Sequence, residues 1–122
     1  MSQFNFAGNA TTTALIVPAS CANTAAATSA AFDGLGYDGP VLVTQSKGLG
    51  TGSLDGKLQM SLDGSTGWTD TGVSFSQATT GAGLQTVAIN PNGYQRYLRY
   101  VGTIVTGPQL LSVTVSGVKK YV

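Results

Sequence analysis

The sequence predicts an all-β fold, an antiparallel β-sandwich, on three observations. Seven or eight short segments are rich in β-branched residues or alternate apolar with polar side chains, as strands do. Asp-Gly, Gly-Pro and Asn-Pro pairs lie between these segments and favour tight turns. No stretch has the apolar spacing with which an amphipathic helix docks on a core. Among sandwiches, we expect a jelly roll.

Residues 54–70 are predicted to form a hairpin around which the rest of the chain is arranged. The first half alternates polar and apolar residues, so an extended strand places Leu58, Met60 and Leu62 on one face. An Asp-Gly pair follows and favours a reversal of the chain. Trp68, the only tryptophan, comes just after it. We expect its indole to cover the Leu58 face, with a ligand-binding role as the alternative.

The other predicted strands lie on both sides of this hairpin. They are residues 11–17, 41–45, the segment around 73–75, 84–89, 94–105 and 110–118. Pro18 is expected to end the first of them, because proline cannot donate to a strand ladder. Residues 22–31 are predicted to be strand or irregular, since they lack large apolar side chains. Residues 32–40 are predicted to be a loop or a bulged connection.

Residues 1–10 are predicted to form an extended arm, and residues 11–122 a single β-sandwich domain. Phe4 and Phe6 are two positions apart, so both rings lie on one side of an extended segment. Such an arm can grip a neighbouring surface by adding to it as a strand, which makes these two residues candidates for binding a neighbour. An edge strand of the same domain, or a frayed end, is the alternative.

The low charge of the chain restricts its partners. Only 9% of the 122 residues are charged, against about 25% in ordinary soluble proteins. The six basic residues nearly balance the five acidic ones, so we expect neither nucleic acid nor a membrane surface as partner. A weakly charged surface resists association poorly, which predicts a protein that works in contact with neighbours.

Composition also argues against an enzyme. The chain has no histidine and no glutamate, which excludes Ser-His-Asp and Cys-His arrangements. A general base would have to be an aspartate, and four of the five aspartates precede a glycine in turn-forming pairs. Asp33 and Asp38 could offer oxygen ligands to Ca²⁺, but their spacing matches no EF-hand loop. We therefore expect no catalysis, no cofactor and no metal.

Residues 94–105, YQRYLRYVGTIV, contain both arginines of the chain and three tyrosines. In a strand, Leu98 and Tyr100 share one face, and Tyr97 and Arg99 share the other. Arginine between tyrosines suits stacking on bases or sugars, whereas a central strand with its arginines paired to an aspartate is the plainer interpretation. The candidate ligand-binding residues are Trp68, Arg96, Tyr97 and Arg99.

These motifs together resemble a known family. The succession GYDG at 36–39, LDGKLQMSLDGSTGWTD at 54–70, Phe75 and YQRYLRYVGTIVTG at 94–107 is similar to small head-decoration, or cement, proteins of tailed bacteriophages. In those proteins an L-x-x-K-L-Q-x-S strand precedes a D-G-S-T-x-W turn, and an R-Y-x-R-Y-V strand follows. The chain departs from the pattern at Gly56 and at an additional Gly67, which indicates a bulge.

The resemblance implies a virion protein on the capsid exterior, made in the host cytoplasm. It would bind the major capsid protein and stabilise the head, with Phe4 and Phe6 as capsid- or neighbour-binding residues. It would also associate with itself as a homotrimer or homodimer, because symmetric shells present symmetric junctions.

A second and weaker resemblance leaves an alternative open. The S-x-D-G and R-Y-x-R signatures are also similar to discoidin-like jelly-roll binding modules. That likeness implies a carbohydrate-binding module, or a β-sandwich associated with a phage tail or fibre, but fold analogy alone does not transfer function.

Overall fold

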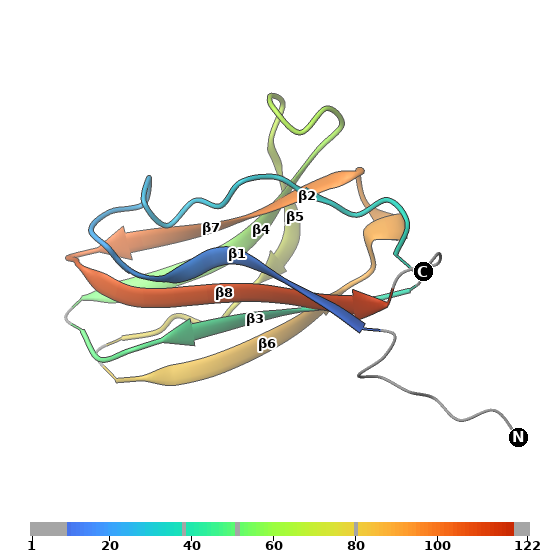
Figure 1. The fold of residues 1–122 in the computed structure, drawn as a ribbon. Coiled ribbons are helices and arrows are strands. Elements are labelled where there is room, and N and C mark those ends of the chain that lie inside the picture. The colour runs from blue at the N-terminus through green and yellow to red at the C-terminus, as the bar shows by residue number, and fades with distance from the viewer. Residues whose placement is uncertain (1–9, 38, 51, 80, 119–122) are drawn as a thin grey trace, which may run out of the picture.

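The protein, described by a computed structural model over residues 10–37, 39–50, 52–79 and 81–118, is built from eight strands (Figure 1). The strands are β1 (Ala10–Cys21), β2 (Phe32–Asp33), β3 (Val41–Lys47), β4 (Ser53–Ser61), β5 (Thr69–Ser74), β6 (Gly83–Ile89), β7 (Tyr97–Val105) and β8 (Gln109–Val118). Within these ranges the one helical segment is a 3₁₀ turn, η1 (Pro91–Gly93), and no helix there is long and apolar enough to cross a membrane.

Two antiparallel four-stranded sheets pack face to face and confirm the predicted sandwich. The first sheet has the order β1-β8-β3-β6 and the second β2-β7-β4-β5. Strand β1 pairs with β8, β2 with β7, β3 with β6 and β4 with β5, so the chain is one long hairpin folded over on itself. Pairing of β3 with β8 joins the two strand pairs of the first sheet, and pairing of β4 with β7 joins those of the second. This nested order is that of a jelly roll, with the β4–β5 loop at the tip of the hairpin (Figure 1).

The core is continuous and lies between the sheets. Alternate residues of β3, β4, β7 and β8 point inward, which produces the strict burial alternation of β3 and β8. Tyr100 is the largest fully buried side chain. The same core cluster includes Phe32, Phe75, Leu54, Leu58, Leu98 and Leu111.

A hydrogen bond at the centre of this core joins the two sheets. Tyr100 on β7 donates from Oη to the Gln45 Oε1 atom on β3 at 2.5 Å. Both side chains are essentially fully buried, and burial raises the pKa of Tyr100 well above its ordinary value. The backbone of Tyr100 is also held, because its N–H donates to Ser29 Oγ at 2.9 Å. The central tyrosine therefore connects three segments of the chain.

Gly56 makes room for this buried pair. It sits opposite Gly102 in regular β4–β7 pairing, so it forms no bulge with β7. A Cβ at position 56 would meet the Gln45 amide oxygen and would lie 2.7 Å from Tyr100 Oη. The bulge predicted from the glycines lies instead between β4 and β5, where the register shifts between Lys57 and Gln59.

Several strand limits differ from those predicted. Strand β1 begins at Ala10, which was expected to belong to the arm, and it continues past Pro18 to Cys21. Pro18 is tolerated because the ladder with β8 shifts register between Ile16 and Ala19, which leaves the proline unpaired. Strand β4 ends at Ser61, so Leu62 is 75% exposed and does not share the buried face with Leu58.

The segments predicted as irregular are held by β7. Residues 22–31 form turns with one bridge, Thr28 to Val101, and Gly102 N–H donates to Ala27 O at 3.0 Å. Cys21 at the start of this segment is buried, and burial raises the pKa of its thiol. Residues 32–40, predicted as a loop, contain the two-residue strand β2.

We expect Tyr100→Phe to lower the free energy of unfolding by about 1–3 kcal/mol, because it leaves the buried Gln45 oxygen without its donor. Urea denaturation measures the change. The matched control is Tyr94→Phe at an exposed tyrosine, for which the change stays within about 0.5 kcal/mol. Equal stability of the two variants would contradict the structural role given to the Tyr100 hydroxyl.

Candidate functional site

The outer face of the second sheet carries the predicted ligand-binding residues. In β7, Leu98 and Tyr100 point into the core, whereas Tyr97 and Arg99 point outward. The alternation alone showed which residues share a face, and the structure shows that the face with Tyr97 and Arg99 is the outer one. Arg96 precedes β7, and its side chain is exposed. Phe4 and Phe6, the candidate neighbour-binding residues, lie outside the described part of the chain.

Trp68 belongs to this outer face and not to the core, so the predicted packing of its indole over Leu58 and Met60 is wrong. The Arg99 guanidinium carbon lies 4.5 Å from the centre of the indole ring. Because Arg99 projects from the solvent side of β7, the tryptophan that it covers must lie there as well. Trp68 is half-buried and immediately precedes β5.

A chain of polar contacts runs across three strands from Arg99. Its Nε and Nη2 atoms both donate to Gln59 Oε1 on β4, at 2.9 and 2.8 Å. Gln59 Nε2 donates to Asp70 Oδ1 on β5 at 3.0 Å, and Lys57 Nζ lies 3.1 Å from the same oxygen. The hydrogen bond from Gln59, followed by that from Lys57, lowers the pKa of Asp70. Among the described residues no carboxylate pairs directly with Arg99.

The second predicted arginine is engaged differently. Arg96 forms a two-point ion pair with Asp33, with Nε to Oδ1 at 3.0 Å and Nη2 to Oδ2 at 2.8 Å. These bonds lower the pKa of Asp33. The Arg96 guanidinium also lies 5.0 Å from the Tyr97 ring centre. Asp33, which was considered as a calcium ligand, is thus committed to an arginine, and Asp38 lies outside the described residues.

The β4–β5 loop is stabilised by its own side chains. Asp63 accepts hydrogen bonds from the Ser65 and Thr66 N–H groups, both at 2.9 Å, and from the Thr66 hydroxyl at 2.8 Å. These donors, the Thr66 N–H first, hold the pKa of Asp63 far below its ordinary value. Gly64 has a φ of 77° and packs under the Tyr97 ring, where a Cβ would come within 3.0 Å.

The opposite outer face, on the first sheet, has a different character that the sequence analysis missed. Its exposed and half-buried residues include Thr12, Leu42, Thr44, Ser46, Leu84, Thr86, Ala88, Leu110, Ser112, Thr114 and Ser116. None is charged. Of the charged residues that the structure describes, all but Lys47 belong to the second sheet or its flanking loops, and Lys47 is buried. We call these eleven residues the uncharged face.

Hydroxyl groups on the uncharged face pair with each other across strands. Thr12 Oγ1 lies 2.9 Å from Ser116 Oγ, and Thr44 Oγ1 lies 3.2 Å from Thr86 Oγ1. The exposed leucines Leu84 and Leu110 add apolar area. Removing such a face from water costs less than removing a charged one. The signal was present in the sequence as serine or threonine at alternate positions of strands whose outward-facing residues are uncharged.

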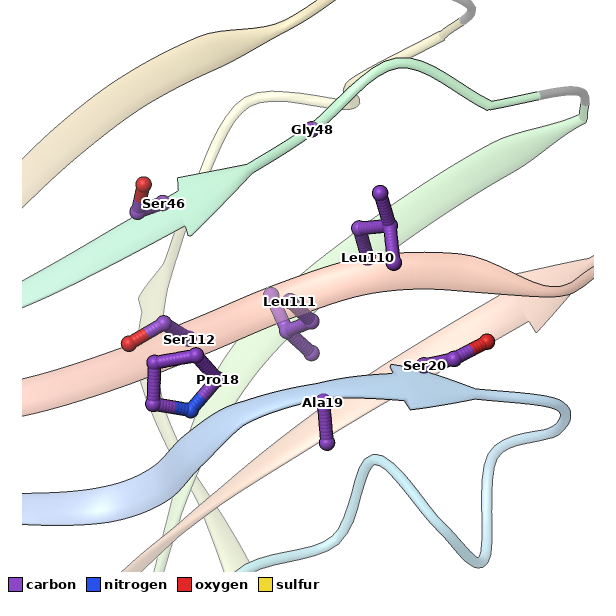
Figure 2. Close-up of a pocket in the computed structure, with 8 residues that line it drawn as sticks. All are labelled: Pro18, Ala19, Ser20, Ser46, Gly48, Leu110, Leu111 and Ser112. Carbon is purple, nitrogen blue, oxygen red and sulfur yellow. The ribbon is translucent and has the colours of Figure 1, made fainter.

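A hollow lies at one end of the uncharged face, between β1, β8 and the end of β3 (Figure 2). It has a volume of about 370 Å³ and is lined by Pro18, Ala19, Ser20, Ser46, Gly48, Leu110, Leu111 and Ser112. The bulged course of β1 around Pro18 shapes one wall, and the 53% exposed Leu110 lies opposite it. The lining contains no charged group.

Comparison with known proteins supports the fold. No protein-family model and no curated protein sequence matches the chain. The SPBc2 prophage-derived protein YomS is similar in structure, with a TM-score of 0.59 and 14% identity over 91% of this chain and 94% of that one. CBM28, a carbohydrate-binding module specific for non-crystalline cellulose, gives a TM-score of 0.45 and 13% identity over 90% of this chain and 73% of that chain. At 14% identity the likeness to YomS concerns the fold alone.

We expect Asp63→Asn to flatten the loss of stability in acid. The folded protein lowers the pKa of Asp63, so this carboxylate stabilises the fold at neutral pH and ceases to do so as the pH falls below the ordinary aspartate value of about 3.9. Thermal denaturation of the variant and the wild type between about pH 5 and pH 2 measures this. Ser65→Ala, which retains the backbone donor, should keep the wild-type profile. Identical profiles for Asp63→Asn and the wild type would refute the assignment.

Proposed function

We propose that the chain is a structural protein of a tailed-phage virion that binds the outside of the capsid and stabilises the head. The observation that carries this proposal is the uncharged face, a broad β surface whose hydroxyls are partly paired and whose leucines are exposed. The resemblance to decoration proteins supports it, as does the structural likeness to a prophage-derived protein.

The division of charge suggests how the molecule is oriented. The second sheet presents Arg96, Arg99, Lys57 and Asp70 to solvent, and these groups favour hydration. The uncharged face desolvates at lower cost, so it is the face we place against the major capsid protein. In this orientation the charged sheet forms the outer surface of the decorated shell.

Many weak contacts then act together. A face of this size buries a modest area, typical of weak interfaces, and each copy alone would dissociate readily. Copies joined to each other as a homotrimer or homodimer bind several capsid sites at once, and the resulting avidity holds them on the shell. The role requires no catalysis, cofactor, nucleic acid or membrane. The protein would be made in the host cytoplasm and would end on the capsid exterior.

We expect Thr44→Lys to reduce attachment to undecorated capsids at least about tenfold, because it buries an unpaired ammonium in the contact. Thr103→Lys places the same charge on the outer face of β7 and should leave attachment unchanged. Co-sedimentation with capsids, followed by their thermal rupture, measures both effects. Normal attachment of the Thr44 variant would remove the uncharged face from the capsid contact, and failure of the wild type to bind would overturn the function.

A carbohydrate-binding module is the second candidate, favoured by one specific arrangement. Trp68, Arg99, Gln59 and Asp70 combine an aromatic ring, amide groups and charged hydrogen-bonding groups on one outer face. Protein sites for sugars use the same kinds of group. The guanidinium already covers one side of the indole, so a sugar would stack on the other side or bind along the edge of the arginine.

For this candidate we expect Trp68→Ala or Arg99→Ala to abolish glycan binding without loss of the fold, because Trp68 lies outside the core. A glycan array, with circular dichroism as the folding check, measures this. Tyr94→Ala, at an exposed tyrosine away from the network, is the control. An array with no hit for the wild type would eliminate the sugar-binding candidate and leave the capsid proposal intact.

A further inference from the structure

The hollow on the uncharged face combines an apolar floor with a hydroxyl rim. Pro18, Ala19 and Leu110 supply carbon surface, and Ser20, Ser46 and Ser112 supply hydroxyls around it (Figure 2). Gly48 contributes to the shape, because a Cβ there would lie 3.0 Å from the Leu110 Cβ atom. A volume of about 370 Å³ is at the lower end of the range of ligand pockets and suits one or two side chains.

We propose that this hollow receives Phe4 and Phe6 from the N-terminal segment of a second copy of the chain. The inference rests on the self-association within the proposed function and not on the capsid contact. The hollow is the surface that the predicted arm would bind.

The chemistry of the segment matches that of the hollow. Residues 1–9, MSQFNFAGN, have no charged side chain, as the hollow has none. The two phenyl rings would replace water over Pro18 and Leu110, an apolar burial typical of aromatic anchors. The amide side chains beside the rings, Gln3 and Asn5, can exchange hydrogen bonds with the serine hydroxyls at the rim.

Chain length favours a second copy over the same one. Strand β1 starts at Ala10 and reaches the hollow at Pro18, about 26 Å away at the rise of an extended strand. Phe4 is six residues before Ala10, so its backbone extends at most about 20 Å from that point. A chain that doubled back along β1 would also use some of these residues for the reversal, so Phe4 would fall short of its own Pro18.

Binding of this kind joins two different surfaces, a segment on one copy and a hollow on another. Such head-to-tail contacts close into a dimer by reciprocal exchange, or into a ring when the rotation between copies permits. Both closures are compatible with the proposed homodimer or homotrimer. The contact can be tested by changing its two halves, the segment and the hollow, separately and on different molecules.

The test uses purified full-length protein and no capsid. Sedimentation velocity should show a concentration-dependent oligomer for the wild type. The double variant Phe4→Ala/Phe6→Ala and the single variant Leu110→Lys should each weaken association at least about tenfold. Leu84→Lys changes a leucine of the same face that does not line the hollow, and it should associate as the wild type does. Circular dichroism verifies that every variant is folded.

Mixing completes the test. The Phe4→Ala/Phe6→Ala variant keeps its hollow and the Leu110→Lys variant keeps its segment, so an equimolar mixture should form a one-to-one complex that neither forms alone. A synthetic peptide of residues 1–9 should compete with wild-type association. A monomeric wild type, normal association of the Phe4→Ala/Phe6→Ala variant, or equal effects of Leu110→Lys and Leu84→Lys would overturn the proposal. None of these outcomes depends on binding to a capsid.

Discussion

The hydrogen bond between Tyr100 and Gln45 is the constraint on which both outer faces depend. It joins β7 to β3 across the core, and Gly56 provides the space for it. Side chains alternate along a strand, so a tyrosine fixed inward at position 100 places Arg99 outward, and a glutamine fixed inward at 45 places Thr44 outward. A slip of one residue in either strand would exchange core and surface. The buried pair therefore helps to determine which sheet presents charge and which presents hydroxyls.

The chain folds as nested pairs around the β4–β5 hairpin, and successive pairs belong to alternate sheets. The second sheet contains the innermost pair, β4 and β5, and Asp63 and its neighbours hold the loop between these two strands. Most of the charges lie in and around these strands. The first sheet is assembled from both ends of the sequence, because β1 pairs with β8. Strand β1, which begins at Ala10, is an edge strand of the sheet that carries the uncharged face, a location suited to contact with a neighbouring copy.

Much of the architecture could be predicted from local patterns, and the failures have physical causes. Alternation and turn pairs identified the sandwich, the jelly roll and the strands that include 41–45, 84–89 and 110–118. Trp68 was assigned to the core because hydrophobicity suggests burial, but hydrophobicity does not reveal that Arg99 covers the indole from outside. Gly56 suggested a bulge, and only the three-dimensional packing shows that it makes room for Tyr100. The uncharged face was missed because it is made by strands distant in sequence, and sequence alone does not place them side by side.

The central claim is that one face of the sandwich adheres and the other remains in solvent. Electron cryomicroscopy of purified phage particles that contain this chain tests it most directly, because it resolves both the presence and the orientation of each copy. The account predicts density for the sandwich on the capsid exterior, with Thr44, Thr86 and Thr114 toward the shell and Arg99 toward solvent. A particle surface without this chain, or with the charged sheet against the shell, would contradict it.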